Sequence, residues 1–166
     1  MIALPFTQVD AFAHAPFTGN PAAVMPLEEW LDDAVLQAIA AENNLAETAF
    51  LVKLPETSEA DYELRWFTPA VEVALCGHAT LASGHVLLAP DADSIRFRTR
   101  RAGDLTVSRA GQGYRLDLPA WGAQPIETPG WAGLLSPVQP IDVRWREGGY
   151  VVLRYADAAQ ILALKP

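Results

Sequence analysis

Runs of alternating apolar and polar residues dominate the first 118 positions and predict strands. An opening strand is expected over residues 4–12, where Leu4 and Phe6 would lie on one side and Val9 and Ala11 on the other. A short strand is expected after the turn at 19–21, and further strands over residues 47–52, 62–67, 94–99, 105–109 and 114–118. The pattern therefore predicts a first domain that is rich in sheet.

Two segments have helical spacing instead. Asp32 and Asp33 open one helix, because acidic residues suit the positive end of the helix dipole, and the pair at 43–44 would close it. The second segment, from His78 to Ala89, is apolar or small on nearly every face, so a helix there would be buried all round. Strands before and after a buried helix predict an α+β fold in which the strands wrap around that helix.

Proline becomes frequent after residue 118, which places the end of the first domain there. Five prolines between residues 119 and 140 predict an extended, partly packed crossover. Residues 141–166 then predict a hairpin about Glu147–Gly149 and a short helix from Asp157 to Leu164. We expect this second domain to be incomplete, because so short a segment seldom folds alone.

Composition excludes several classes of protein. Hydrophobic residues make up 51% of the 166 positions and charged residues 19%, which is typical of a globular protein. The net charge of −8 opposes binding to nucleic acid, and a single cysteine excludes an internal disulfide framework. The sequence contains no signal peptide and no apolar stretch long enough to cross a membrane, so we expect no membrane association and a cytoplasmic protein.

Glu47 is the candidate for proton transfer. It is a lone carboxylate within Asn44–Phe50, where nearly all neighbours are apolar or small. A carboxyl group that loses solvation in such surroundings can both accept and return a proton near neutral pH. The alternative is a solvent-facing glutamate at the start of a strand.

Three further residues are candidates for binding a substrate. Gly77 and His78 lie where a loop enters the predicted buried helix, whose free N–H groups could hold a carboxylate or oxyanion. Gly77 could equally serve only to relieve crowding, and His78 only to cap the helix. Asn20 could shape a pocket wall through its amide, or form part of a turn with Gly19 and Pro21.

Metal and thiol chemistry are not expected. His78 and His85 are separated on a helix by roughly 10 Å, too far to share one ion, and His14 is remote in sequence. Cys76 would need a lowered pKa and a second base to act as a proton-transferring thiol, so a buried inert cysteine is the favoured reading. No glycine-rich nucleotide fingerprint is present, and we expect neither a metal nor an organic cofactor.

Five motifs together resemble the PhzF-like family of the diaminopimelate-epimerase-like superfamily. They are Gln8–Phe12, Phe17–Val24, Asn44–Phe50, Leu64–Pro69 and Val71–Ala82. The resemblance implies two similar domains, each a curved sheet about a central helix, with the active site between them. The characterised phenazine-pathway member isomerises a dihydro-hydroxyanthranilate through the glutamate that matches Glu47, and Gly77 and His78 match the loop that lines the cleft.

The resemblance therefore implies an isomerase that moves a proton on a small cyclic or amino-acid-like carboxylate. PhzF-like chains continue beyond Lys165 into a second glycine-rich loop that supplies the other wall, so we expect this chain to be weak or inactive alone. The alternative is a non-catalytic half-domain that self-associates or binds a partner. The family resemblance allows a homodimer and does not identify the substrate.

Overall fold

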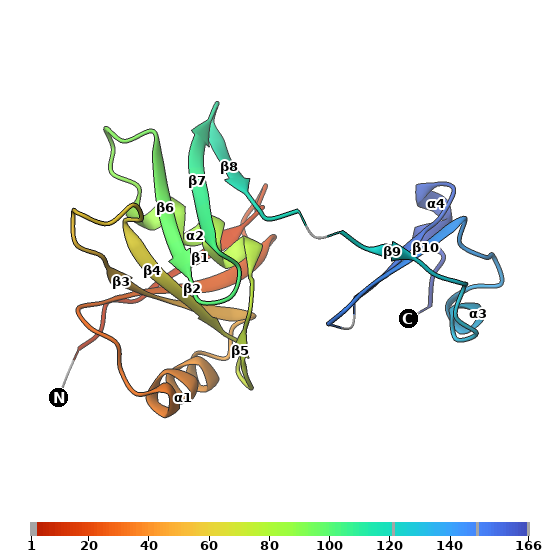
Figure 1. Ribbon diagram of the computed structural model, residues 1–166, viewed down its shortest axis with the longest axis horizontal. Coiled ribbons are helices and arrows are strands. Elements are labelled where there is room, and N and C mark those ends of the chain that lie inside the picture. The colour runs from red at the N-terminus through yellow and green to blue at the C-terminus, as the bar shows by residue number, and fades with distance from the viewer. Residues whose placement is uncertain (1–2, 121, 149, 166) are drawn as a thin grey trace. The chain divides into compact units, whose positions relative to one another are not determined.

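The computed structural model describes residues 3–120, 122–148 and 150–165. The chain divides into two compact units, Met1–Pro119 and Ala120–Pro166. Figure 1 shows the elements of each unit.

One mixed sheet forms the frame of the first unit. Its strands, in spatial order, are β1 (Thr7–Ala11), β2 (Asn20–Leu27), β3 (Glu47–Lys53), β4 (Tyr62–Phe67), β6 (Ser94–Thr99), β7 (Asp104–Ala110) and β8 (Gly113–Asp117), with β5 (Glu72–Val73) paired to β4. The pairs β2–β3 and β4–β6 are parallel and the others antiparallel. Parallel neighbours need a crossover, and the helices α1 (Asp33–Asn43) and α2 (Gly77–Leu87) lie in these two connections.

Alternate residues of the central strands pack into two separate cores. Ala22 and Val24 of β2 belong to the core that includes α2, whereas Ala23 and Met25 belong to the core that includes α1. The period of two in a strand produces this division, because successive side chains point to opposite faces of the sheet. The two helices therefore cover opposite faces of β2, β3 and β4.

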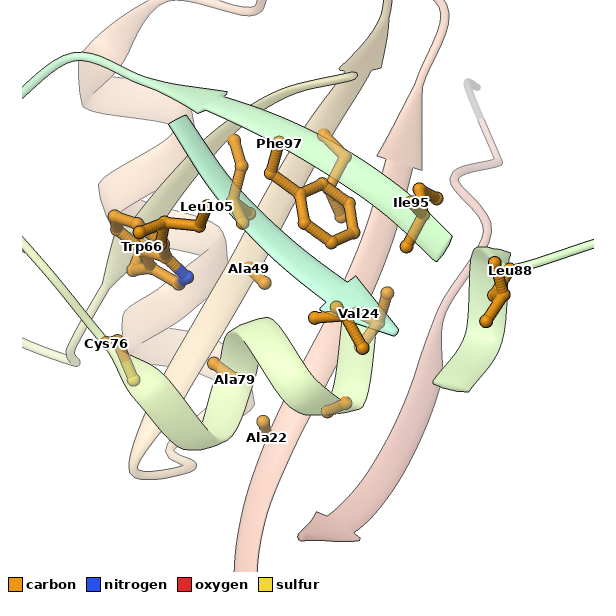
Figure 2. Packing of buried hydrophobic residues seen from close by; sticks show 14 residues of the cluster. Ala22, Val24, Ala49, Trp66, Cys76, Ala79, Leu88, Ile95, Phe97 and Leu105 are labelled. Atoms are coloured by element: carbon orange, nitrogen blue, oxygen red, sulfur yellow. The ribbon is translucent and has the colours of Figure 1, made fainter. Parts of the chain in front are cut away.

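The helix α2 is the centre of the larger core, and contacts β1, β2, β3, β7 and β8. Figure 2 shows Ala79 of this helix among large side chains such as Phe97 and Leu105 of the facing strands. Gly84 allows the closest approach: a Cβ atom at this position would lie 2.5 Å from Cγ1 of Val107. A helix of small residues thus fits inside the curve of the sheet.

The prediction that this helix is buried all round is only partly right. Residues 79, 80 and 82–84 are buried, but Leu81 is only partly buried and His85 is exposed. The reason is that β1 and β8 form the two edges of the sheet and do not pair with each other. The face of α2 between these edges borders a surface pocket, and there His85 Nδ1 lies 3.1 Å from the Tyr114 hydroxyl.

The second unit contains a small antiparallel sheet and two short helices. The sheet runs β11 (Tyr150–Arg154), β10 (Asp142–Arg146) and β9 (Gln124–Pro125), and the helices are α3 (Ala132–Leu135) and α4 (Ala158–Leu162). Both β9 and α3 lie within residues 119–140, where we expected an extended crossover. Asp157 caps α4 by accepting a hydrogen bond of 2.9 Å from the Gln160 N–H. Gly149, in the predicted hairpin turn, lies outside the described residues.

The other predicted elements of the first unit are found within a few residues of their expected bounds. The turn between β7 and β8 is formed by Gly111 and Gln112, with Ala110 paired to Gly113 and a φ of +58° at Gly111. None of the helices in the described ranges has both the length and the apolar composition of a membrane span.

Candidate functional site

Glu47 and His78 meet where β3 and α2 begin. Glu47 is the first residue of β3, and His78 is the second residue of α2. The His78 Nε2 atom lies 3.1 Å from Glu47 Oε2, and the two side chains are 10% and 19% exposed. A largely buried carboxylate therefore faces a largely buried imidazole.

The end of α1 and the register of the sheet explain why Glu47 points toward α2. Asn44 ends α1 with a φ of +49°, a left-handed conformation that asparagine tolerates, and the chain then enters β3. Glu47 pairs with Ala22 of the parallel neighbour β2. Both Ala22 and Ala49, two residues after Glu47, belong to the core around α2, so Glu47 lies on that same face.

Cys76 lies next to this pair, with its Sγ atom 3.4 Å from His78 Nδ1. Burial raises the pKa of the Cys76 thiol to about 12, and the Glu47 carboxylate contributes to the rise. The N–H groups of Ala79 and His78 favour the thiolate, but their effect is smaller than that of burial. The raised pKa favours the protonated thiol at neutral pH, and Cys76 is buried, as predicted.

The start of α2 presents backbone donors, and those of His78 and Ala79 face the Cys76 sulfur. Cys76 is the N-cap residue and its side chain does not cap the helix; the Thr80 N–H bonds to the Cys76 carbonyl. The N–H groups of Gly77, His78 and Ala79 precede this bond and so have no acceptor within the helix. A Cβ atom on Gly77 would meet nothing closer than Leu116 Cδ2, at 3.8 Å. The described fold therefore does not require glycine here, and the missing side chain leaves room beside the N–H group of Gly77.

Asn20 lies at the same end of the parallel strands β2 and β3 as Glu47, but it is not part of the Glu47–His78 pair. It is the first residue of β2 and pairs with Ala11. Its side chain lies on the same face of β2 as that of Ala22, because alternate residues of a strand share a face. Asn20 therefore lies on the side of the sheet that carries Glu47, and it precedes the residue paired with Glu47 by two positions. Among the described residues, its side chain makes no hydrogen bond to Glu47 or His78.

Two phenylalanines near Asn20 were not recognised from the sequence as candidate site residues. Phe12 and Phe17 have φ values of +61° and +63°, which are unusual for bulky residues, and both side chains are exposed. Strained backbone often occurs near functional sites. In the sequence, only Gly19 pointed to unusual backbone near these residues. Its φ is +89°, and a Cβ atom at this position would lie 2.6 Å from the Ala11 carbonyl oxygen. Residue type alone does not indicate a positive φ at phenylalanine.

The structure also brings together donor atoms that could hold a metal ion. One carboxylate oxygen of Glu47, the sulfur of Cys76 and one ring nitrogen of His78 all lie within 4.8 Å of one another. The prediction of no metal site was based on the spacing of the histidines alone. It did not consider that β3 brings a carboxylate to the start of α2.

The fold and this site define the class of protein. A solved structure of a PhzF-family phenazine biosynthesis protein from Enterococcus faecalis matches with a TM-score of 0.83 and 37% identity, over 99% of this chain and 62% of that one. A predicted epimerase from Pseudomonas aeruginosa matches with a TM-score of 0.65 and 26% identity, over 86% of this chain and 55% of that one. The protein has the α+β, epimerase-like fold, as predicted.

Its family follows from the sequence comparisons. Residues 9–130 match the family model described as phenazine biosynthesis-like protein, PhzC-PhzF, and the chain belongs to this family. An uncharacterized isomerase of Pseudomonas aeruginosa is 48% identical over 166 residues, which is 98% of this chain and 61% of that protein. A human phenazine biosynthesis-like domain-containing protein is 48% identical over 128 residues, which is 74% of this chain and 44% of that protein. The chain thus spans less than two thirds of these relatives.

Proposed function

We propose that this protein is an isomerase that moves a proton on a small cyclic or amino-acid-like carboxylate, with Glu47 as the proton carrier. The observation that carries the proposal is the largely buried Glu47 carboxylate, 3.1 Å from His78 at the start of α2. The family supports it, because relatives of this chain are named isomerases.

Each group has one role in the proposed reaction. The Glu47 carboxylate takes a proton from a substrate carbon, and the electron pair of the broken C–H bond moves into the conjugated system of the substrate. The N–H groups of Gly77 and His78 hold the substrate carboxylate and stabilise the negative charge that develops on it. Glu47 then returns its proton to a second carbon, so that the isomer forms with no net change in atoms or electrons.

His78 is a positioning residue in this scheme. Its ring lies between Glu47 and Cys76, with Nε2 toward the carboxylate and Nδ1 toward the thiol. The close approach of this ring limits the orientations of the Glu47 carboxylate. Asn20 and the neighbouring Phe17 would form the outer wall of the binding site, where Asn20 could hydrogen-bond to the substrate.

The test is proton–deuterium exchange into dihydro-hydroxyanthranilate and a panel of cyclic amino acids, followed by NMR in D₂O. Replacing Glu47 by glutamine should lower the exchange rate at least about 100-fold, the usual contribution of a general acid–base group. The matched control is Glu42→Gln, which changes an exposed glutamate of α1 and should leave exchange unchanged. Exchange that persists in a folded Glu47→Gln variant would contradict the proposed role.

We expect the exchange catalysed by these 166 residues to be slow. The chain covers 61% of the relative from Pseudomonas aeruginosa, and the second wall of the site that the family resemblance implies would contribute orientation and charge stabilisation. The comparison is therefore best made between this chain and a full-length relative, each with and without the glutamate.

A second candidate function is self-association through the second unit. Leu134, Val152 and Leu162 are 82%, 55% and 86% exposed, and large exposed apolar side chains favour association when they form a contiguous patch. Sedimentation at increasing protein concentration distinguishes the candidates. A mass that rises with concentration, in a protein with no exchange activity on any of the carboxylates, would support this candidate instead of the isomerase.

A further inference from the structure

Three different metal-ligating groups converge at the start of α2. Glu47 contributes a carboxylate oxygen, Cys76 a sulfur and His78 a ring nitrogen, all within 4.8 Å of one another. The contacts between neighbouring side chains are shorter. Cys76 Sγ lies 3.4 Å from His78 Nδ1, and His78 Nε2 lies 3.1 Å from Glu47 Oε2. Such a set is distinct from the clusters of exposed acidic residues that occur on most surfaces.

The types of donor select the class of cation. Sulfur and imidazole nitrogen favour Zn²⁺ and similar ions over Ca²⁺ and Mg²⁺, which prefer oxygen. Ligand atoms bound to one Zn²⁺ at about 2.0–2.3 Å lie roughly 3.3–3.8 Å apart in a tetrahedral arrangement. Separations of up to 4.8 Å exceed that range. Because Nδ1 faces the sulfur and Nε2 faces the carboxylate, one ion can take only one of the two nitrogens, and binding requires the His78 or Cys76 side chain to rotate. Three protein ligands with a fourth position open is an arrangement that Zn²⁺ commonly adopts.

His78 supplies a second, independent observation. Its Nε2 atom is buried and has no hydrogen-bond partner among the described residues, although Glu47 Oε2 is only 3.1 Å away. The short distance without an aligned hydrogen bond leaves a polar atom unsatisfied in a side chain that is 90% buried, as its 10% exposure gives. A cation bound by both groups would satisfy the nitrogen and the carboxylate together.

We propose that Glu47, Cys76 and His78 form a binding site for a thiophilic divalent cation of the Zn²⁺ class. Binding replaces the proton on the Cys76 sulfur, which is released to solvent. The +2 charge of the ion then balances the thiolate and the carboxylate, so the bound unit is neutral in its buried position. Occupancy engages Glu47, and the ion is therefore an inhibitor of proton transfer; this last consequence rests on the proposed function.

The test is titration of the tag-free, metal-free chain with Zn²⁺ alone by calorimetry, and with Co²⁺ by absorbance. We expect one Zn²⁺ per chain, and a thiolate-to-Co²⁺ charge-transfer band. Replacing Cys76 by serine should abolish the band and raise the Zn²⁺ dissociation constant at least tenfold or so, since even indirect ligand partners contribute about 10- to 100-fold. The matched control is His85→Gln, which removes an exposed histidine of the same helix and should change neither result.

Two results would overturn the proposal: Zn²⁺ binding weaker than about 1 mM, or binding that is unchanged in a folded Cys76→Ser variant. If that variant does not fold, amide NMR of the wild-type chain decides. Zn²⁺ should shift the signals of residues 47 and 76–78, and shifts confined to other residues would also reject the site. Because these measurements need no substrate, a failed metal site is distinguishable from a failed isomerase: Glu47-dependent exchange without Zn²⁺ binding rejects only the metal proposal.

Discussion

Small residues at single positions let a helix occupy the interior of the sheet. Gly84 faces Val107 so closely that a Cβ atom would lie 2.5 Å from Cγ1 and 2.8 Å from Cβ of the valine. Val107 is fully buried in β7 and cannot turn into solvent. The packing at this point depends on the absence of one methyl group.

Replacing Gly84 by alanine should lower the free energy of unfolding by about 1–3 kcal/mol through overpacking. The gain of about 1 kcal/mol in helix propensity offsets only part of this cost. Chemical denaturation monitored by circular dichroism measures the difference. Gly77→Ala is the control in the same helix, because its nearest contact of 3.8 Å is ordinary. Equal stability of the two variants would show that Val107 moves aside freely.

At the scale of elements, the Arg65 side chain of β4 connects this strand to α1 and β5. It lies on the face of β4 opposite to the face that carries Trp66. Its guanidinium donates to both Glu72 oxygens, at 2.8 and 2.9 Å, and to Asp33 at 2.8 Å. It also lies over the rings of Trp30 and Phe67. The side chain is 1% exposed, so its charge is retained in the interior through these partners.

This network should make the fold sensitive to acid. The hydrogen bonds from Arg65 lower the pKa of Glu72, so the folded protein keeps this carboxylate ionised to lower pH than the unfolded chain does. The stability it contributes is complete above the unfolded pKa of about 4.3 and is lost as the pH falls through the folded value. Thermal unfolding between about pH 5 and 3 should therefore show a smaller loss for Glu72→Gln than for wild type. An identical loss, with Glu42→Gln as the surface control, would contradict this role.

The same elements show what could be predicted from the sequence. Sequence patterns predicted both helices of the first unit and its strands other than β5, because alternation and helical spacing report which faces are buried. It could not predict the network around Arg65, since a charged residue in an alternating strand indicates a solvent-facing position. The apolar surroundings made Glu47 a candidate, and the family resemblance favoured proton transfer over a solvent-facing glutamate. Its contact with His78, and the nearness of Cys76, depend on how β3 and α2 pack, which no local pattern specifies.

On the scale of the whole molecule, the two units differ in how much they bury. In the first unit, the hairpin β6–β7 buries Ile95, Phe97, Leu105 and Val107. In the second unit, the described residues of the hairpin β10–β11 bury only Val143. Apolar burial is the dominant stabilising term in folding, so the second unit should open more readily.

Hydrogen exchange should reveal this difference between two hairpins of the same antiparallel type. Backbone amides of β6 and β7 should exchange on the order of 100-fold more slowly than those of β10 and β11, because local opening costs least where few apolar contacts are lost. Mass spectrometry of the exchanged, digested protein measures both segments in one experiment. Equal protection of the two hairpins would mean that the chain unfolds as one cooperative unit.

The parallel pairing of Glu47 with Ala22 has a consequence for how the sequence can change in length. A single inserted or deleted residue between Asn44 and Glu47 that shifted β3 by one position would turn every side chain of the strand to the other face. Glu47 would then point toward α1, and the residues that β3 contributes to the two cores would exchange sides. In the turn after β6, by contrast, a Cβ atom on Gly103 would meet nothing within 4 Å. Length variation should therefore be accepted in the turn after β6 and rejected just before Glu47.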